Sequence, residues 1–270
     1  MTDRPAAKDD IIAANRGAWN EAAARHRAHE QYAALLAGFA RPGHSVLDAT
    51  LTGRLRGLGL AGEAVAQLCC NNARELLSIR NLGAASITGF DFSEAFLDQA
   101  RELAAAAGIE VELVRSELEQ IPAAYDGRFD LAVVTIGVLG WMPDLAAFFA
   151  TARRLLKPGG HLVIYESHPI LNMFDERNTS LPPRPDESYF REQPLRSDDG
   201  LDYWAKRDYA ATPCYWHFHK MSDVVMGLVN GGFALEDFEE LPHNLDTYDH
   251  LENQAQQLPL SYVMVARREG

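Results

Sequence analysis

The sequence has few cysteines and no apolar run long enough to cross a membrane. Its cysteines are Cys69, Cys70 and Cys214, which is too few for a disulfide framework and predicts a reducing, cytoplasmic setting. The longest apolar run, residues 131–142, is shorter than the roughly 20 residues that a spanning helix needs. The charged N-terminus, MTDRPAAKDD, does not have the pattern of a secretory signal.

Basic residues are also scarce relative to acidic ones. The sequence has 25 Lys and Arg residues and 38 Asp and Glu residues, which gives a formal net charge of −13. A surface this acidic argues against nucleic acid or an anionic membrane as a partner, although a small local basic site is compatible with it. The 270 residues, 47% of them hydrophobic, suffice for one large domain or for a core with additions.

From Glu63 onward, strand-like segments alternate with helix-like segments. Strands are expected at 64–70, 86–91, 109–115, 128–138 and 160–167, with helices at 73–83, 93–108 and 144–156. A further helix at 222–233 precedes two last strands, 234–241 and 260–267, which suit an antiparallel pair. This alternation predicts an α/β fold with a Rossmann-like, doubly wound, mostly parallel seven-stranded sheet. Residues 45–49 could pass for the first strand, but no strand with a terminal acid follows them at the right distance.

The two flanks of this core have a different character. Residues 8–40 are rich in alanine and are expected to be helical, with Arg41-Pro42-Gly43 ending the helix. Residues 169–212 are rich in proline and charge, which indicates an insertion or lid after the fifth strand. We therefore expect an N-terminal helical segment at 1–43 and one domain at 44–270.

The stretch LLKPGGHLVIYES, residues 155–167, joins a helix to a buried strand. The helix is expected to end at Lys157, because Pro158 cannot continue it, and Gly159-Gly160 allow a turn before the strand begins at His161. This join resembles the one before the fifth strand of class I S-adenosylmethionine (SAM) dependent methyltransferases. The resemblance extends over residues 63–168 and implies SAM as the cofactor.

The loop after the first strand departs from the D-x-G-x-G-x-G pattern typical of that family. The matching positions are Gln67, Cys69, Asn71 and Ala73, and none of them is glycine. Asparagine tolerates positive φ, so Asn71 and Asn72 are expected to make the turn, with the helix from Ala73 aiming free N–H groups at a carboxylate. QLCCNNARE is similar to QLCCNNGRE segments of small-molecule methyltransferase-like proteins, which favours a working variant. A collapsed loop without cofactor is the alternative.

The resemblance also assigns roles to side chains at the ends of the strands. Asp91, at the end of the second strand, would accept the ribose hydroxyls, although it could equally cap a helix. Glu117 would bind the adenine amino group and Glu75 the cofactor's ammonium group, with ordinary surface or helix-start acids as the alternatives. The predicted cofactor-binding set is Gln67, Cys69, Cys70, Asn71, Asn72, Glu75, Asp91, Phe92, Glu117, Leu118, Thr135, Ile136 and Gly137.

The segment GVLGW followed by PDL resembles one branch of the family that methylates small molecules. Trp141 would then shape the acceptor pocket, and Trp19 and Tyr32 could face the sulfonium cation, with core packing as the alternative reading.

Three histidines are candidates for the pocket. His168 follows the fifth strand, and His217 and His219 fall on one face of an extended segment. His168 or His219 could act as a general base, with a structural hydrogen bond as the alternative. We expect no metal, because no third ligand follows the H-x-H pair at a recognisable spacing.

The resemblance therefore implies a methyltransferase (EC 2.1.1.-) that transfers a methyl group directly to a small-molecule acceptor, with neither nucleic acid nor membrane as a partner. One rival is a degenerate methyltransferase fold that only binds a ligand or partner. A dinucleotide-dependent oxidoreductase is disfavoured, because its glycine fingerprint and a Tyr-x-x-x-Lys site are missing. The sequence leaves the oligomeric state open, a homodimer included.

Overall fold

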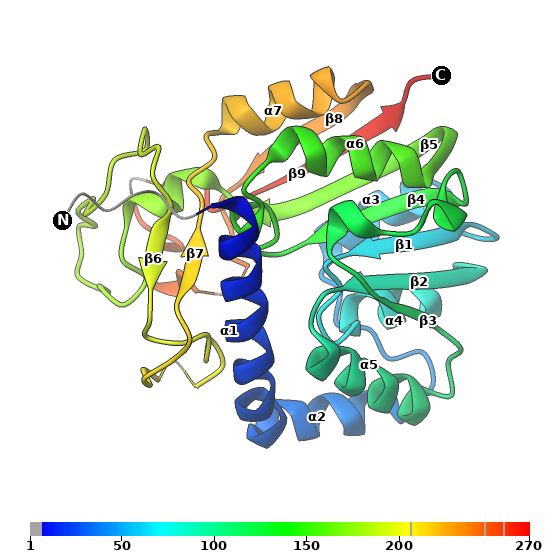
Figure 1. The fold of residues 1–270 in the computed structure, drawn as a ribbon, viewed down its shortest axis with the longest axis horizontal. Helices are drawn as coiled ribbons and strands as arrows, with labels where there is room; N and C mark the ends of the chain where they lie inside the picture. Colours follow the sequence, from blue (N-terminus) through cyan, green and yellow to red (C-terminus); the bar gives the residue numbers. More distant parts are fainter. Residues whose placement is uncertain (1–6, 206, 246, 256) are drawn as a thin grey trace.

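A single seven-stranded sheet organises the molecule (Figure 1). The computed structural model describes residues 7–205, 207–245, 247–255 and 257–270. The strand order is β3-β2-β1-β4-β5-β9-β8, and β9 runs antiparallel to both of its neighbours, while the remaining pairs are parallel. The strands are β1 (Ala64–Leu68), β2 (Ser86–Asp91), β3 (Glu112–Arg115), β4 (Phe129–Thr135), β5 (Leu156–Ser167), β8 (Phe233–Leu241) and β9 (Ser261–Arg268). The predicted mostly parallel sheet and the antiparallel last pair are confirmed.

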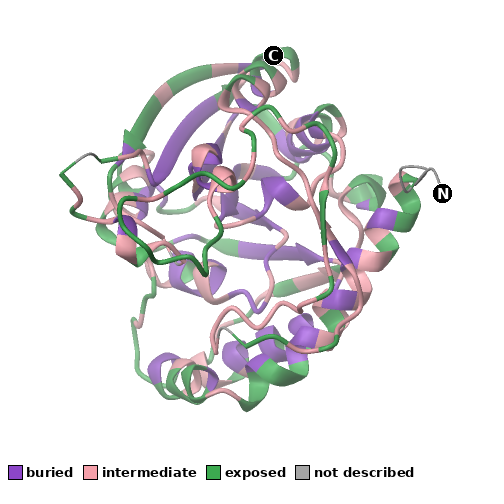
Figure 2. Cartoon of the chain, turned by 90° about the vertical axis from the view of Figure 1, so that its left-hand side faces the viewer, coloured by how far each residue is buried: buried purple, intermediate pink, exposed green. Residues whose placement is uncertain are grey.

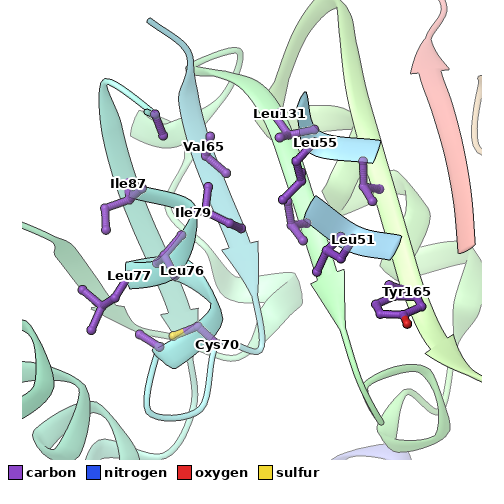
Figure 3. Packing of buried hydrophobic residues seen from close by; sticks show 14 of the residues in the cluster. Leu51, Leu55, Val65, Cys70, Leu76, Leu77, Ile79, Ile87, Leu131 and Tyr165 are labelled. Atoms are coloured by element: carbon purple, nitrogen blue, oxygen red, sulfur yellow. The ribbon is translucent and has the colours of Figure 1, made fainter. Parts of the chain in front are cut away.

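Helices cover both faces of the sheet because strand residues alternate between the two faces. Val65 of β1 packs in a cluster with α3 (Ala49–Gly57), α4 (Arg74–Asn81) and α5 (Glu94–Ala107). Its neighbour Ala66 packs on the other side, with α6 (Leu145–Leu155) and α7 (Met221–Asn230). In Figure 3, Leu51 and Leu55 of α3 project onto the sheet beside Leu131 and Tyr165.

Local capping explains where two of these helices begin and end. The Ser93 hydroxyl accepts from the Phe96 N–H at the start of α5, and Gly108 ends that helix with φ +63°. Asp48 accepts from the Leu51 N–H at 2.8 Å and so starts α3. The decision against a strand at 45–49 is therefore confirmed.

The join between α6 and β5 differs from the prediction. The helix ends at Leu155 rather than Lys157, and the strand begins at Leu156 rather than His161. Phe129 pairs with Leu156 and Leu131 pairs with His161, so residues 157–160 bulge out of the ladder, with Gly159 at φ +78°. The pairing of buried Leu156 with β4 extends the strand beyond the proline and glycines, which local turn chemistry alone cannot foresee.

The N-terminal segment forms two helices instead of one. α1 (Lys8–Ala28) and α2 (Glu30–Phe39) are separated at His29, whose ring accepts from the Gln31 N–H at 3.2 Å and caps α2. α1 also pairs with the inserted segment through Asn15, whose side chain exchanges two hydrogen bonds with the Tyr215 backbone. The N-terminal helix and the insertion therefore support each other.

The insertion contains a small antiparallel sheet of β6 (Leu195–Ser197) and β7 (Cys214–Trp216). In Figure 1, β6, β7 and α1 stand opposite the carboxyl ends of the parallel strands. In Figure 2, the segments in front of the buried strands are mostly exposed or intermediate. Short 3₁₀ helices are η1 (Leu118–Gln120), η2 (Ala123–Tyr125), η3 (Leu139–Trp141), η4 (Pro169–Met173) and η5 (Asp249–Leu251). Within the described ranges, no helix is long and apolar enough to cross a membrane.

Candidate active site

A cavity of about 1400 Å³ opens at the carboxyl ends of β1, β2, β4 and β5, and α1, η3 and the insertion complete its wall. Sites for one small ligand measure roughly 300–1000 Å³, so this volume can hold two molecules. The position agrees with the rule that ligands bind at the carboxyl edge of a doubly wound sheet. Every residue predicted for the site lines this cavity except Tyr32.

The loop from β1 to α4 has an unusual backbone. Cys69, Asn71 and Ala73 adopt positive φ angles of 56°, 51° and 57°. These are the positions where the D-x-G-x-G-x-G pattern has glycine, so the chain keeps a glycine-like backbone without glycine. The prediction that Asn71 turns the chain is confirmed, whereas Asn72 does not take positive φ and Cys69 and Ala73 do. Such angles cost a non-glycine residue about 1–2 kcal/mol each.

Two buried amide side chains in this region each have one polar atom without a hydrogen-bond partner among the described residues. Gln67 donates through Nε2 to the Thr135 hydroxyl at 2.7 Å, but its Oε1 finds no donor among the described residues. The Nδ2 of Asn72, a side chain that is only 2% exposed, likewise has no acceptor in the described part of the chain. An unpaired buried polar atom lowers the stability of the fold. The Gln67 Oε1 acceptor and the Asn72 Nδ2 donor could therefore both bind a polar ligand beside the N-terminus of α4.

Asp91 fastens this loop to the end of β2. Its Oδ2 accepts from the Asn71 N–H and its Oδ1 from the Ser93 N–H, both at 2.8 Å. Burial raises the pKa of this carboxyl to about 6, against the opposing effect of those hydrogen bonds. The Phe92 N–H is a third backbone donor to this carboxylate, which still has acceptor capacity for a ligand hydroxyl.

The acids proposed for the adenine and ammonium groups have protein partners. Glu117 Oε1 accepts from Arg16 of α1 at 2.5 Å, and its Oε2 accepts from Gln120 at 2.7 Å. Glu75 pairs with Arg74 at 2.6 Å. Arg16 thus ties α1 across the mouth of the cavity to the end of β3. Both acids line the cavity, and their cofactor contacts stay predictions.

A buried acid that the sequence analysis missed organises the end of β4. Glu166 of β5 accepts from the N–H groups of Gly137 at 2.6 Å, Val138 at 2.7 Å and Leu139 at 3.4 Å. Burial raises the pKa of Glu166 to about 7, although these three donors oppose the shift. The turn needs this support because Ile136 and Gly137 have φ angles of 24° and 79°.

Indole rings line the part of the cavity toward the insertion. Trp19 of α1 meets Trp141 of η3 edge to face, with 5.3 Å between ring centroids. Trp141 meets Trp216 of β7 in the same way at 5.0 Å. The predicted pocket positions of Trp19 and Trp141 agree with this geometry, and Trp216 is a further aromatic residue that the sequence analysis did not single out.

Residues 65–160 match the model of a family described as a methyltransferase domain. A solved SAM-dependent methyltransferase from Mesorhizobium loti covers 80% of the chain at 25% identity, with a TM-score of 0.59 and 96% of its own length aligned. Residues 65–160 therefore form a methyltransferase domain of the class I type. The match covers the strands and loops that build the cofactor side of the cavity.

Two further relatives resemble the methyltransferase domain over different extents. The ubiquinone biosynthesis O-methyltransferase of Pseudomonas paraeruginosa is 33% identical over 106 residues, which are 39% of this chain and 45% of that protein. The chain thus spans less than half the length of this curated relative. The 1,6-didemethyltoxoflavin-N1-methyltransferase of Burkholderia thailandensis, solved with bound 1,6-didemethyltoxoflavin and S-adenosylhomocysteine, covers 100% of this chain at 17% identity with a TM-score of 0.60, over 94% of its own length.

The three candidate histidines divide into two groups. His168 Nδ1 accepts from the Ile170 N–H at 3.1 Å, so its Nε2 carries the proton that faces Glu240 at 2.9 Å. Both nitrogens of His168 are therefore engaged. Its general-base role stays a prediction, which would require His168 to exchange one of these partners for the acceptor.

His217 and His219 lie side by side, with ring centroids 5.8 Å apart and planes 12° apart, as their spacing predicts. His219 Nε2 faces the Met142 carbonyl at 2.8 Å, which leaves the lone pair on Nδ1. Burial lowers the pKa of His219, and burial with the neighbouring His219 lowers the pKa of His217 to about 4. Both rings are therefore neutral near pH 7. Among the described residues, no group of three or more His, Cys, Asp or Glu could hold a metal.

Tyr32 does not belong to the site. It is a buried residue of α2, 3% exposed, and its hydroxyl donates to Glu102 of α5 at 2.6 Å. The prediction that Tyr32 faces the pocket was wrong because it continued the face of α1 through residue 29, where the helix breaks and changes direction. Trp19, on the unbroken part, does reach the cavity.

Proposed function

We propose that the chain is a SAM-dependent methyltransferase that acts on a small-molecule acceptor. The observation that carries this proposal is the glycine-free loop, which holds three residues at positive φ and leaves two buried amide atoms unpartnered. In a collapsed or degenerate loop, we would expect the backbone to relax from these strained φ angles and the buried amide atoms to find partners within the protein. The matched methyltransferase domain supports the same reading.

The residues at the loop fit the polar ends of the cofactor. Gln67 Oε1 can accept from its ammonium group, and Asn72 Nδ2 and the N-terminus of α4 can donate to its carboxylate. Asp91 can accept from the ribose hydroxyls. Phe92 would pack on the adenine with the Leu118 backbone nearby, and Glu117 would accept from the adenine amino group. Bound there, SAM would supply an activated methyl group for direct transfer.

The other half of the cavity would receive the acceptor. Thr135, Ile136 and Gly137 separate the two halves, and the Glu166 carboxylate fixes the turn that follows them. Most of the rate would come from holding the acceptor in line with the methyl group. His219, neutral and with a free lone pair on Nδ1, could take a proton where the acceptor has one to lose.

The proposal includes the setting of the reaction. An acidic chain with a net charge of −13 suits neither nucleic acid nor anionic membrane as partner. Three free thiols within the described chain suit the cytoplasm, and a homodimer is compatible with the structure.

Calorimetric titration with S-adenosylhomocysteine tests the cofactor proposal, with NAD as the control ligand. We expect micromolar binding of S-adenosylhomocysteine and no heat from NAD. If the folded protein binds neither ligand, the proposed function is contradicted, and a domain that binds a different partner is favoured. Binding of NAD instead would favour the oxidoreductase alternative.

Substitution of Asp91 should distinguish a ribose contact from simple loop support. Asp91→Asn loses a charged acceptor, so S-adenosylhomocysteine affinity should fall by about 1–3 kcal/mol. For the wild type, affinity should also fall below pH 6, where the carboxyl with its pKa of about 6 takes up a proton, whereas Asp91→Asn should lose this dependence. Asp48→Asn, which alters a helix cap outside the cavity, is the matched control. Unchanged affinity in a folded Asp91→Asn variant would contradict the ribose role.

A further inference from the structure

An aromatic wall lines the acceptor half of the cavity, and its neighbouring indole rings meet edge to face. Trp19, Trp141 and Trp216 come from three separate elements, and each is partly exposed where it lines the cavity. Trp216 rests directly on the backbone of Gly140, since a Cβ there would come within 2.2 Å of the indole ring. Its Nε1–H donates to Asn172 Oδ1 at 2.9 Å, so the ring needs no polar partner from a ligand. These contacts fix the orientation of the wall before any ligand arrives.

The charges around this wall disfavour anions. Among the residues that line the cavity, acidic side chains outnumber basic ones. Arg177 is paired with Asp199 at 3.3 Å and with Asp208 at 3.0 Å, and Arg196 is paired with Asp198 at 3.2 Å.

The remaining basic groups do not reverse this balance. Lys8 is paired with Glu119 at 2.5 Å and also contacts Asp144, and Arg74 is paired with Glu75 at 2.6 Å. Arg207 is exposed to solvent, where its charge is screened. His217 is neutral near pH 7 because burial lowers its pKa to about 4.

We propose that the acceptor is a flat aromatic molecule that carries an amine or no charge, and that the site rejects aromatic acids. This inference rests on the proposed methyl transfer and names its substrate class. Indole rings bind planar aromatic ligands and attract cations, whereas the excess of acidic groups around the cavity disfavours carboxylates and phosphates. Phe96, which is buried and edge-on to Trp19 at 5.6 Å, supports this wall from behind.

Three matched probes test this class by calorimetry on protein saturated with S-adenosylhomocysteine. Tryptamine has the flat ring and a positive charge, indole-3-acetate has the same ring and a negative charge, and 2-cyclohexylethylamine has the charge without the flat ring. We expect tryptamine to bind at least tenfold more tightly than either of the others. Because the cofactor product is bound first, failure of the methyltransferase proposal would show at that earlier step.

Variants of the wall give the second readout. Trp141→Ala should weaken tryptamine binding at least tenfold, and Trp141→Leu, which keeps an apolar side chain without an aromatic face, should weaken it nearly as much. Trp204→Ala is the matched control, since Trp204 stacks on His26 and does not line the cavity. Retained S-adenosylhomocysteine affinity shows that each variant is folded. Equal or tighter binding of indole-3-acetate, absence of tryptamine binding, or an unaffected Trp141→Leu variant would overturn the proposal.

Discussion

At the scale of single residues, the loop between β1 and α4 shows that residues other than glycine can adopt a backbone conformation that favours glycine. Glycine reaches positive φ without a steric penalty, whereas Cys69 and Ala73 do so against the contact between Cβ and the following carbonyl. Asn71 adapts better, because its short polar side chain can bond locally, here by accepting from the Asn72 N–H at 2.7 Å. The strain is held in place by Asp91, which binds the Asn71 N–H.

Glycine usually lowers the stability of a folded protein, but replacing Cys69 by glycine should raise it relative to alanine. We expect Cys69→Gly to be more stable than Cys69→Ala by about 0.5–1 kcal/mol, because relief at φ +56° exceeds the entropic cost of glycine. Ala105→Gly, at an exposed position inside α5, should instead cost about 1 kcal/mol. Urea unfolding measures all three. A less stable Cys69→Gly would mean that the loop is not strained there.

At the scale of elements, β5 both extends the sheet and supports the turn that follows β4. Its last residues bring Glu166 under the turn that leaves β4, and three N–H groups of that turn converge on the carboxylate. The turn leads directly into η3 and Trp141, so one buried acid links the methyl-donor half of the cavity to the aromatic wall. Its raised pKa makes this link sensitive to pH.

Substitution of Glu166 should reveal that sensitivity as a change in stability. The pKa of Glu166 is raised in the folded state from 4.5 to about 7, so folded protein binds the extra proton between those pH values. This contribution is fully present below about pH 4.5 and is lost as pH rises through 7. The stability difference between wild type and Glu166→Gln should thus fall by about 3 kcal/mol from pH 4.5 to 7.5.

Urea unfolding at several pH values measures this difference. Burial lowers the pKa of His26 and of His217 to about 4, which affects stability in the opposite direction, but both histidines are present in both proteins and cancel. Glu110→Gln removes one exposed carboxylate and controls for net charge. A difference that does not vary with pH would show that Glu166 is ionised in the folded protein throughout this range.

Sequence patterns predicted most elements of the sheet because their causes are local. The span 86–91 matches β2 in full, and Ser93 and Gly108 bound α5 as expected. The failures have non-local causes. The early start of β5 depends on pairing with Phe129, and the loss of Tyr32 from the site depends on a helix break at His29. Glu166 lies near the end of a predicted strand, but its three N–H donors are 27 to 29 positions away in the sequence. Local patterns therefore could not indicate its role.

At the scale of the whole molecule, the acidic balance of the chain bears on the cofactor itself. The formal net charge is −13, and acidic groups also predominate among the residues around the cavity. SAM carries one net positive charge and S-adenosylhomocysteine carries none, since methyl transfer removes the sulfonium charge. An acidic protein should attract the first and be indifferent to the second.

Salt should therefore affect the two ligands differently. Between 50 and 500 mM NaCl, the Kd for SAM should rise on the order of threefold relative to the Kd for S-adenosylhomocysteine, because ions screen the attraction. Paired calorimetric titrations at each salt concentration measure the ratio, and the neutral ligand serves as the internal control for any salt effect on the fold. A ratio that stays constant would mean that charge does not distinguish donor from product. If the ratio rises, loss of the sulfonium charge itself favours exchange of product for new donor at low ionic strength.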